Sequence, residues 1–251
     1  TLLSGVLDVA AARDVGVVTV QANDAGIHTF SDEPFSVPLG WDHFDALVVT
    51  MDAVSGAYLR AFAESGRPVV TVYKAPEDFT CPTVVPDNEQ GVRVAVDHLA
   101  GHGHTRIAFV GRDPANADDW SRYAAYREAV LAHGLAYTDP VLVPWDVNET
   151  YRGAGAVDQL RARGEMPSAV IACTDGTAIA LIDALAEADL VVPDDIALIG
   201  FDDIPQAAGC RPPLSTVAQS FSLAGATACS LVCDALDECA RRPGGHRHLT
   251  C

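Results

Sequence analysis

Short runs of β-branched and apolar residues alternate along this chain with stretches whose apolar residues recur at helical spacing. Ala169–Ala172, for example, is followed by a helical stretch from Thr177 to Ala188 and then by the apolar run Ile196–Ile199. Apolar strands separated by helices indicate a parallel sheet that helices cover on both faces. This alternation constrains the fold more than any other feature of the sequence.

The alternation occurs on both sides of about residue 87. The expected strands are residues 17–20, 46–49, 68–72, 107–110, 141–143, 169–172 and 196–199. The expected helices are residues 2–13, 55–64, 88–100, 121–132, 151–163, 177–188 and 222–241. We therefore predict an α/β fold with two doubly wound parallel-sheet lobes, since one very wide sheet explains the repeated cycle less well.

Composition limits the partners of such a fold. Of the 251 residues, 49% are hydrophobic and 20% are charged, which is enough apolar material to bury a core. The 16 basic and 34 acidic residues give a net charge of −18, which argues against this segment binding nucleic acid or an anionic membrane surface. No apolar run long enough to span a membrane and no signal peptide is visible.

The sequence lacks the common motifs of catalysis and of metal binding. The sequence has no GxxxxGK[ST], GxSxG or HExxH motif, so we expect no catalytic residues, no cofactor and no metal site. Its seven cysteines form no CxxC pair and are expected as small apolar core residues in a reducing cytosol. Cys229 and Cys233, four residues apart on an expected helix, could alternatively hold a metal. His98, His102 and His104 lie at a helix end, where a capping role is favoured over zinc.

Ligands of doubly wound sheets bind at the carboxyl ends of the strands, so the residues that follow the expected strands are the candidate site. The polar candidates are Arg122, Asp202, Thr174, Asn116 and Asp118, and the aromatic candidates are Tyr73 and Trp120. Carboxylates and guanidinium groups hold hydroxyl-rich ligands by charge-assisted bonds, and aromatic faces cover a sugar or a base. Asp175 and Asp203 are instead expected to cap a helix and a turn.

Four ordered motifs over residues 46–225 resemble the LacI/GalR family of bacterial repressors. The most specific one is Val192–Asp203, which Pro212–Gln219 follows. The others are Asp87-Asn88 with Gly91 and the run His98–Phe109, and the run Arg122–Val130. The resemblance implies a regulatory domain similar to periplasmic binding proteins of type I, in which two α/β lobes close on a small effector in the cleft between them.

The resemblance also implies a division of the chain and a set of effector-binding residues. The lobes would comprise residues 1–87 with 220–243 and residues 88–219 with 244–251. By their position in the motifs, Arg122 and Asp202 resemble the family's effector-holding arginine and aspartate. Thr174 stands where relatives often carry asparagine. Less specific pocket-lining positions correspond to Asn116, Asp118, Tyr73 and Asn148.

The implied protein is a cytoplasmic, homodimeric transcription regulator. Its effector would be a sugar or a nucleoside or purine, and it would contact DNA only through an N-terminal head that this sequence does not include. The family's first strand would precede Leu2 and is not included either. Three alternatives stay open: a sensor module fused to a signalling output domain, a secreted sugar-binding protein, and an enzyme on the same sheet architecture.

Overall fold

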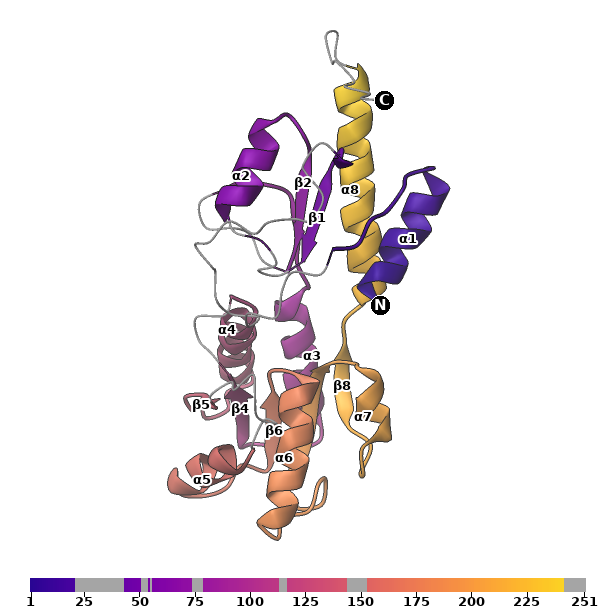
Figure 1. Cartoon of the computed structure of the whole chain (residues 1–251). Coiled ribbons are helices and arrows are strands. Elements are labelled where there is room, and N and C mark those ends of the chain that lie inside the picture. The colour runs from indigo at the N-terminus through magenta and orange to yellow at the C-terminus, as the bar shows by residue number, and fades with distance from the viewer. Residues whose placement is uncertain are drawn as a thin grey trace. The chain divides into compact units, whose positions relative to one another are not determined.

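The chain divides into two compact units in a computed structural model, which describes residues 1–20, 43–50, 54, 56–73, 79–112, 117–143 and 153–241. Unit 1 comprises Thr1–Pro86 with Ser220–Cys251, and unit 2 comprises Asp87–Gln219. Figure 1 shows the helices and strands of both. Unit 2 is therefore one continuous stretch of chain, whereas unit 1 is assembled from two separate stretches.

Unit 2 is built on a parallel sheet, in which β4 and β6 are fully buried. Its described strands are β4 (Ile107–Gly111), β5 (Val141–Leu142), β6 (Ala169–Ala172), β7 (Ala197–Asp202) and β8 (Ser215–Ala218). The order is β5-β4-β6-β7-β8 and every neighbouring pair is parallel. Continuous apolar runs are typical of parallel strands buried on both faces, so the α/β prediction is confirmed here.

Helices cover both faces of this sheet. They are α3 (Asn88–Gly101), α4 (Ala117–Ala132), α5 (Ala154–Ala162), α6 (Asp175–Glu187) and the short α7 (Pro205–Gly209). On β4, Ile107 and Phe109 pack in the core with α3 and α4, whereas Ala108 and Val110 pack with α5 and α6. Successive strand residues point to opposite faces, so the two cores lie on opposite sides and the doubly wound arrangement is confirmed.

Unit 1 repeats the layering on a smaller scale. Its described strands are β1 (Leu47–Thr50), β2 (Val69–Val72) and β3 (Thr83–Val84), which are parallel in the order β1-β2-β3. Its helices are α1 (Leu2–Ala12), α2 (Gly56–Glu64) and α8 (Phe221–Arg241). Residues of α2 pack against Val49 and Val69, whereas residues of α8 pack against Val70 and Val72. Helix α1 lies along α8 (Figure 1).

The predicted strand at residues 17–20 is wrong. These residues adopt no regular secondary structure, and Val17, Val18 and Val20 are 37%, 59% and 41% exposed. β-branched residues fit a pleated surface, but a strand also needs a neighbour to take its backbone hydrogen bonds, and the sequence pattern does not supply that information. Conversely, β3, α7 and β8 were not predicted. β3 and α7 are very short, and β8, Ser-Thr-Val-Ala, lacks the continuous apolar run that marks the predicted strands.

Candidate ligand-binding site

The two strongest sequence candidates, Arg122 and Asp202, lie together in unit 2. Arg122 is on α4, and Asp202 is the last residue of β7. An Arg122 guanidinium nitrogen lies 3.6 Å from Asp202 Oδ1, and the side chains are 4% and 16% exposed. The same guanidinium donates to the carbonyl oxygen of Cys173, which directly follows β6. The pair therefore sits at the carboxyl ends of two adjacent parallel strands, where ligands of such sheets bind.

An aromatic ring supports the pair. The guanidinium carbon of Arg122 lies 3.8 Å from the centroid of the Phe201 ring, which is a cation–π contact with a buried side chain. The ring fits because Gly91 of α3 has no side chain: a Cβ there would be 2.7 Å from it. Gly200 has a similar role, since a Cβ would be 2.2 Å from a carboxylate oxygen of Asp175. These glycines let α3 and α6 approach the end of β7.

Asp202 has both an unusual backbone conformation and a carboxyl group with a raised pKa. Its backbone φ is 122°, a value that L-residues rarely adopt, and such strain is often found at functional sites. Burial raises the pKa of Asp202 from 3.8 to about 6, although the nearby charge of Arg122 and a hydrogen bond from Gln219 lower it. A carboxyl with this pKa is largely ionised at neutral pH and can accept hydrogen bonds from ligand hydroxyl groups.

Two amide side chains complete the cluster, and sequence reasoning did not assign a role to either. Asn88 Oδ1 accepts a hydrogen bond from Arg122 Nε at 2.8 Å, and Asn88 Nδ2 donates to Asp118 Oδ1 at 2.8 Å. Gln219 Nε2 donates to Asp202 Oδ1. In the sequence, Asn88 and Gln219 are only motif residues at element boundaries. Their roles depend on contacts between residues 34 and 17 positions apart.

Thr174 has a structural role in this unit. Its hydroxyl is the N-cap of α6 and accepts from the backbone N–H of Thr177 at 3.2 Å. The expectation that Asp175 caps this helix is therefore wrong. Asp175 is fully buried and its carboxylate accepts from the Thr216 hydroxyl and from the backbone N–H of Ile204 at 2.9 Å. Thr174 still follows β6 at the edge where Arg122 lies.

The other candidates have different surroundings. Asp118, in the first turn of α4, joins the cluster through Asn88. Trp120 is 54% exposed, and its ring lies 5.3 Å from that of Tyr123. Tyr73 belongs to unit 1, where its ring meets Phe221 edge to face. Two further candidates, Asn116 and Asn148, lie outside the described residues.

The cluster offers recognition chemistry more than reactive chemistry. Its nearest thiol, Cys173, is fully buried, and burial raises its pKa to about 11, so it stays protonated at neutral pH and is a poor nucleophile. Within the described ranges, no group of three His, Cys, Asp or Glu residues could hold a metal ion. No described helix combines the length and apolar character needed to cross a bilayer.

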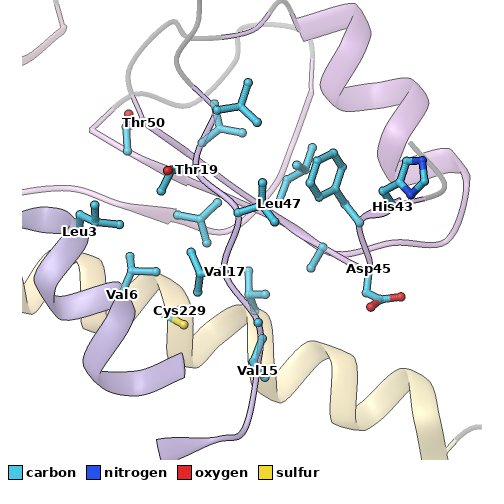
Figure 2. Close-up of a pocket in the computed structure, with 18 of the residues that line it drawn as sticks. Leu3, Val6, Val15, Val17, Thr19, His43, Asp45, Leu47, Thr50 and Cys229 are labelled. Carbon is cyan, nitrogen blue, oxygen red and sulfur yellow. The ribbon is translucent and has the colours of Figure 1, made fainter. Parts of the chain in front are cut away.

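Unit 1 contains a separate, mainly apolar pocket of about 440 Å³. Its lining comes from α1, residues 15–20, β1 and α8, and Figure 2 shows Val6, Val17 and Leu47 facing it. None of the sequence-predicted site residues lines it. The pocket has few groups that could orient a hydroxyl-rich ligand, so the polar cluster of unit 2 is the stronger candidate site.

Comparisons with known proteins show which families the chain resembles. The periplasmic binding protein-like domain family matches residues 96–251. The ribose operon repressor of Escherichia coli is 35% identical over 61% of this chain and 46% of its own length. Catabolite control protein A of Priestia megaterium is 31% identical over 75% of this chain and 57% of its own length. A LacI-family sugar-binding transcriptional regulator from Escherichia coli, solved with phosphate, has a TM-score of 0.67 and 27% identity over 77% of this chain and 69% of its own.

Proposed function

The chain belongs to the periplasmic binding protein-like domain family, and from that premise we propose that it is the effector-sensing domain of a LacI-type transcriptional regulator. The chain spans about half the length of the curated relatives it matches. Those relatives are named as a repressor and a control protein. The regulatory output of the complete protein is accordingly part of the proposal.

The observation that carries the proposal is the buried Arg122–Asp202 pair at the carboxyl ends of β6 and β7. A guanidinium and a carboxylate held in place before a ligand arrives can donate to and accept from neighbouring hydroxyl groups at little cost in side-chain entropy. This chemistry suits a vicinal diol, which can bridge the two charges. We therefore propose a sugar as the effector class, with pentoses first because a ribose operon repressor is among the relatives, and a nucleoside or purine as the alternative.

The remaining candidates extend the same proposal. Asp118 and Thr174 would add polar contacts, and Tyr73, Trp120, Asn116 and Asn148 stay predicted lining residues. The predicted lobes, residues 1–87 with 220–243 and 88–219 with 244–251, are retained as the parts that respond to the effector. We propose that the complete regulator is a cytoplasmic homodimer without catalytic activity and that it contacts DNA through a separate head.

The proposal is tested first by thermal shift of the purified domain against pentoses, hexoses, their phosphates, nucleosides and purines. A ligand at 100 times its dissociation constant adds about 2.7 kcal/mol of stability, which for a chain of this size corresponds to a shift of roughly 5–10 °C. A complete regulator should then change its affinity for operator DNA in response to the same ligand. A folded domain that no compound stabilises would contradict the proposal.

Matched variants locate the site. Asp202→Asn and Arg122→Lys should each lower the affinity for the ligand about 10- to 100-fold, because each removes a charge-assisted or bidentate hydrogen bond. The controls are Arg127→Lys, on the exposed side of the same helix α4, and Asp158→Asn, on the exposed side of α5. If the candidate and control variants bind equally well, the effector does not use this pair.

A further inference from the structure

The polar cluster of unit 2 includes residues at both ends of that unit, where the chain enters it and where the chain leaves it. Unit 2 begins at Asp87 and ends at Gln219. Asn88, the second residue of the unit, bonds Arg122, and Gln219, the last residue, bonds Asp202. We call the two points where the chain passes between the units, Pro86–Asp87 and Gln219–Ser220, the first and second crossing. Each member of the candidate ligand-binding pair therefore has one side-chain bond to a residue next to a crossing.

At the first crossing, both ends of the Asn88 amide are engaged. Asn88 is the first residue of α3, directly after the N-cap Asp87, and it is 5% exposed. Its oxygen accepts from Arg122 and its nitrogen donates to Asp118, each at 2.8 Å. Because an amide has one acceptor end and one donor end, this arrangement fixes its orientation and also the orientation of the guanidinium. The Arg122 guanidinium is therefore bonded directly to the first residue of α3.

At the second crossing, Gln219 follows β8 at once, and β8 pairs with β7 so that Ala218 lies opposite Asp202. The Gln219 amide donates to the same oxygen, Asp202 Oδ1, that lies nearest Arg122. A hydroxyl group that binds Oδ1 would share this acceptor with Gln219. Ligand contact at this oxygen would therefore compete with the bond at the end of unit 2.

We infer that Asn88 and Gln219 are positioning residues that orient Arg122 and Asp202 and carry the state of this pair to the two chain crossings. The regulatory part of the inference rests on the proposed function, in which the pair binds the effector. The network runs without a break from Gln219 through Asp202, Arg122 and Asn88 to Asp118. Coupling of this kind is reciprocal, so a change at either crossing must alter the affinity of the pair for its ligand.

The first experiment needs no ligand, because substitution of the pair itself supplies the perturbation. Amide hydrogen exchange is measured by mass spectrometry at one pH for the wild-type protein, Asp202→Asn and Arg122→Lys, with Arg127→Lys on α4 as the matched control. We expect exchange at the crossing next to the affected bond, residues 218–223 for Asp202→Asn and 86–91 for Arg122→Lys, to change by about fivefold or more. Unchanged exchange at both crossings in both variants overturns the inference.

The second experiment separates positioning from packing. The Asp202 carboxyl is titrated by NMR in the wild-type protein and in Gln219→Ala, with Gln159→Ala as a control whose amide donates to the carbonyl of Leu142 on the far side of the unit. Loss of the Gln219 donor should raise the pKa of Asp202 further above about 6, whereas Gln159→Ala should leave it unchanged. Equal titration in both variants would show that Gln219 does not position the carboxylate.

A third experiment uses D-ribose as the probe. Gln219→Ala, Asn88→Ala and the isosteric Asn88→Asp, included because Asn88 is buried, should each change the affinity for D-ribose by about fivefold or more. If wild-type protein binds none of the sugars, nucleosides or purines, the proposed function fails while the first two experiments still decide the positioning role. If ligand binds and all three variants behave as wild type in every readout, the inference alone fails.

Discussion

Unit 1 and unit 2 are both parallel sheets covered by helices, but they differ in how completely their strands are enclosed. Two neighbouring strands of unit 2, β4 and β6, are buried at every residue, whereas in unit 1 only β2 is, and its neighbour β1 is buried only at Val49. Unit 1 also has an apolar pocket beside β1, bordered by the exposed valines of residues 15–20. Unit 2 builds its core from one continuous stretch of chain, and unit 1 must bring α8 back from the C-terminal part.

The comparison shows which unit holds the candidate ligand-binding pair most firmly. The polar cluster lies at the edge of the more completely enclosed sheet, whose packed side chains hold Arg122 and Asp202 in one geometry. A site that is organised before the ligand arrives avoids the entropy cost of ordering its side chains. The lining of the pocket of unit 1 includes Asp45 but no arginine or lysine, and only Val49 is buried in the strand β1 beside it, so it offers no equivalent charge pair.

The largest expected loss of stability comes from a substitution in the buried strand β4 of unit 2. Phe109 of β4 is 1% exposed and its ring lies 5.4 Å from that of Tyr126. Phe109→Ala should lower the free energy of unfolding by about 3–5 kcal/mol, because it removes a large side chain and leaves a cavity. Val18→Ala in unit 1, at a residue that is 59% exposed, should change it by less than about 0.5 kcal/mol. Urea denaturation followed by circular dichroism measures both, and equal losses would contradict the buried position of Phe109.

The second prediction concerns pH. Burial, opposed by Arg122, Gln219 and Arg112 and reinforced by Asp175, raises the pKa of Asp202 from 3.8 to about 6. The folded state therefore binds this proton more tightly than the unfolded state, so the contribution of Asp202 to stability falls as pH rises from about 4 to 6. The shift corresponds to at most about 3 kcal/mol.

Asp202→Asn should flatten this part of the stability curve. Denaturation between pH 4 and pH 8 measures it, with Asp158→Asn as the exposed control. A wild-type curve and an Asp202→Asn curve of identical slope across this range would contradict the prediction.

The smallest of the three expected losses of stability concerns the close contact between α1 and α8 in unit 1. A Cβ on Gly225 would be 2.0 Å from the carbonyl oxygen of Leu2, and a Cβ on Gly5 would be 1.8 Å from that of Ser222. Gly225→Ala should therefore destabilise the protein by about 1–3 kcal/mol, because α1 and α8 must move apart. Gly16→Ala is the control, since a Cβ there meets no atom within 4 Å. A thermal melt of Gly225→Ala that matches the control would show that the helices do not depend on this close contact.

The alternation of apolar strands and amphipathic helices was sufficient to predict the α/β class, the doubly wound sheet and the repetition of the pattern in two units. Buried parallel strands must be apolar on both faces, and this requirement is visible in any single segment such as Ala169–Ala172. The sequence also indicated that Arg122 and Asp202 lie near the carboxyl ends of strands, because Asp202 comes shortly after the apolar run Ile196–Ile199 and Arg122 follows the loop after Val110. Their role in binding a ligand stays a prediction.

Tertiary structure decided what the local pattern does not contain. Val17–Val20 has the composition of a strand, yet it pairs with no described strand, because pairing depends on which segment lies alongside. The roles of Asn88 and Gln219 likewise arise from hydrogen bonds to residues far along the chain. Sequence periodicity records which face of an element is buried, and only the folded chain determines which polar groups meet at its ends.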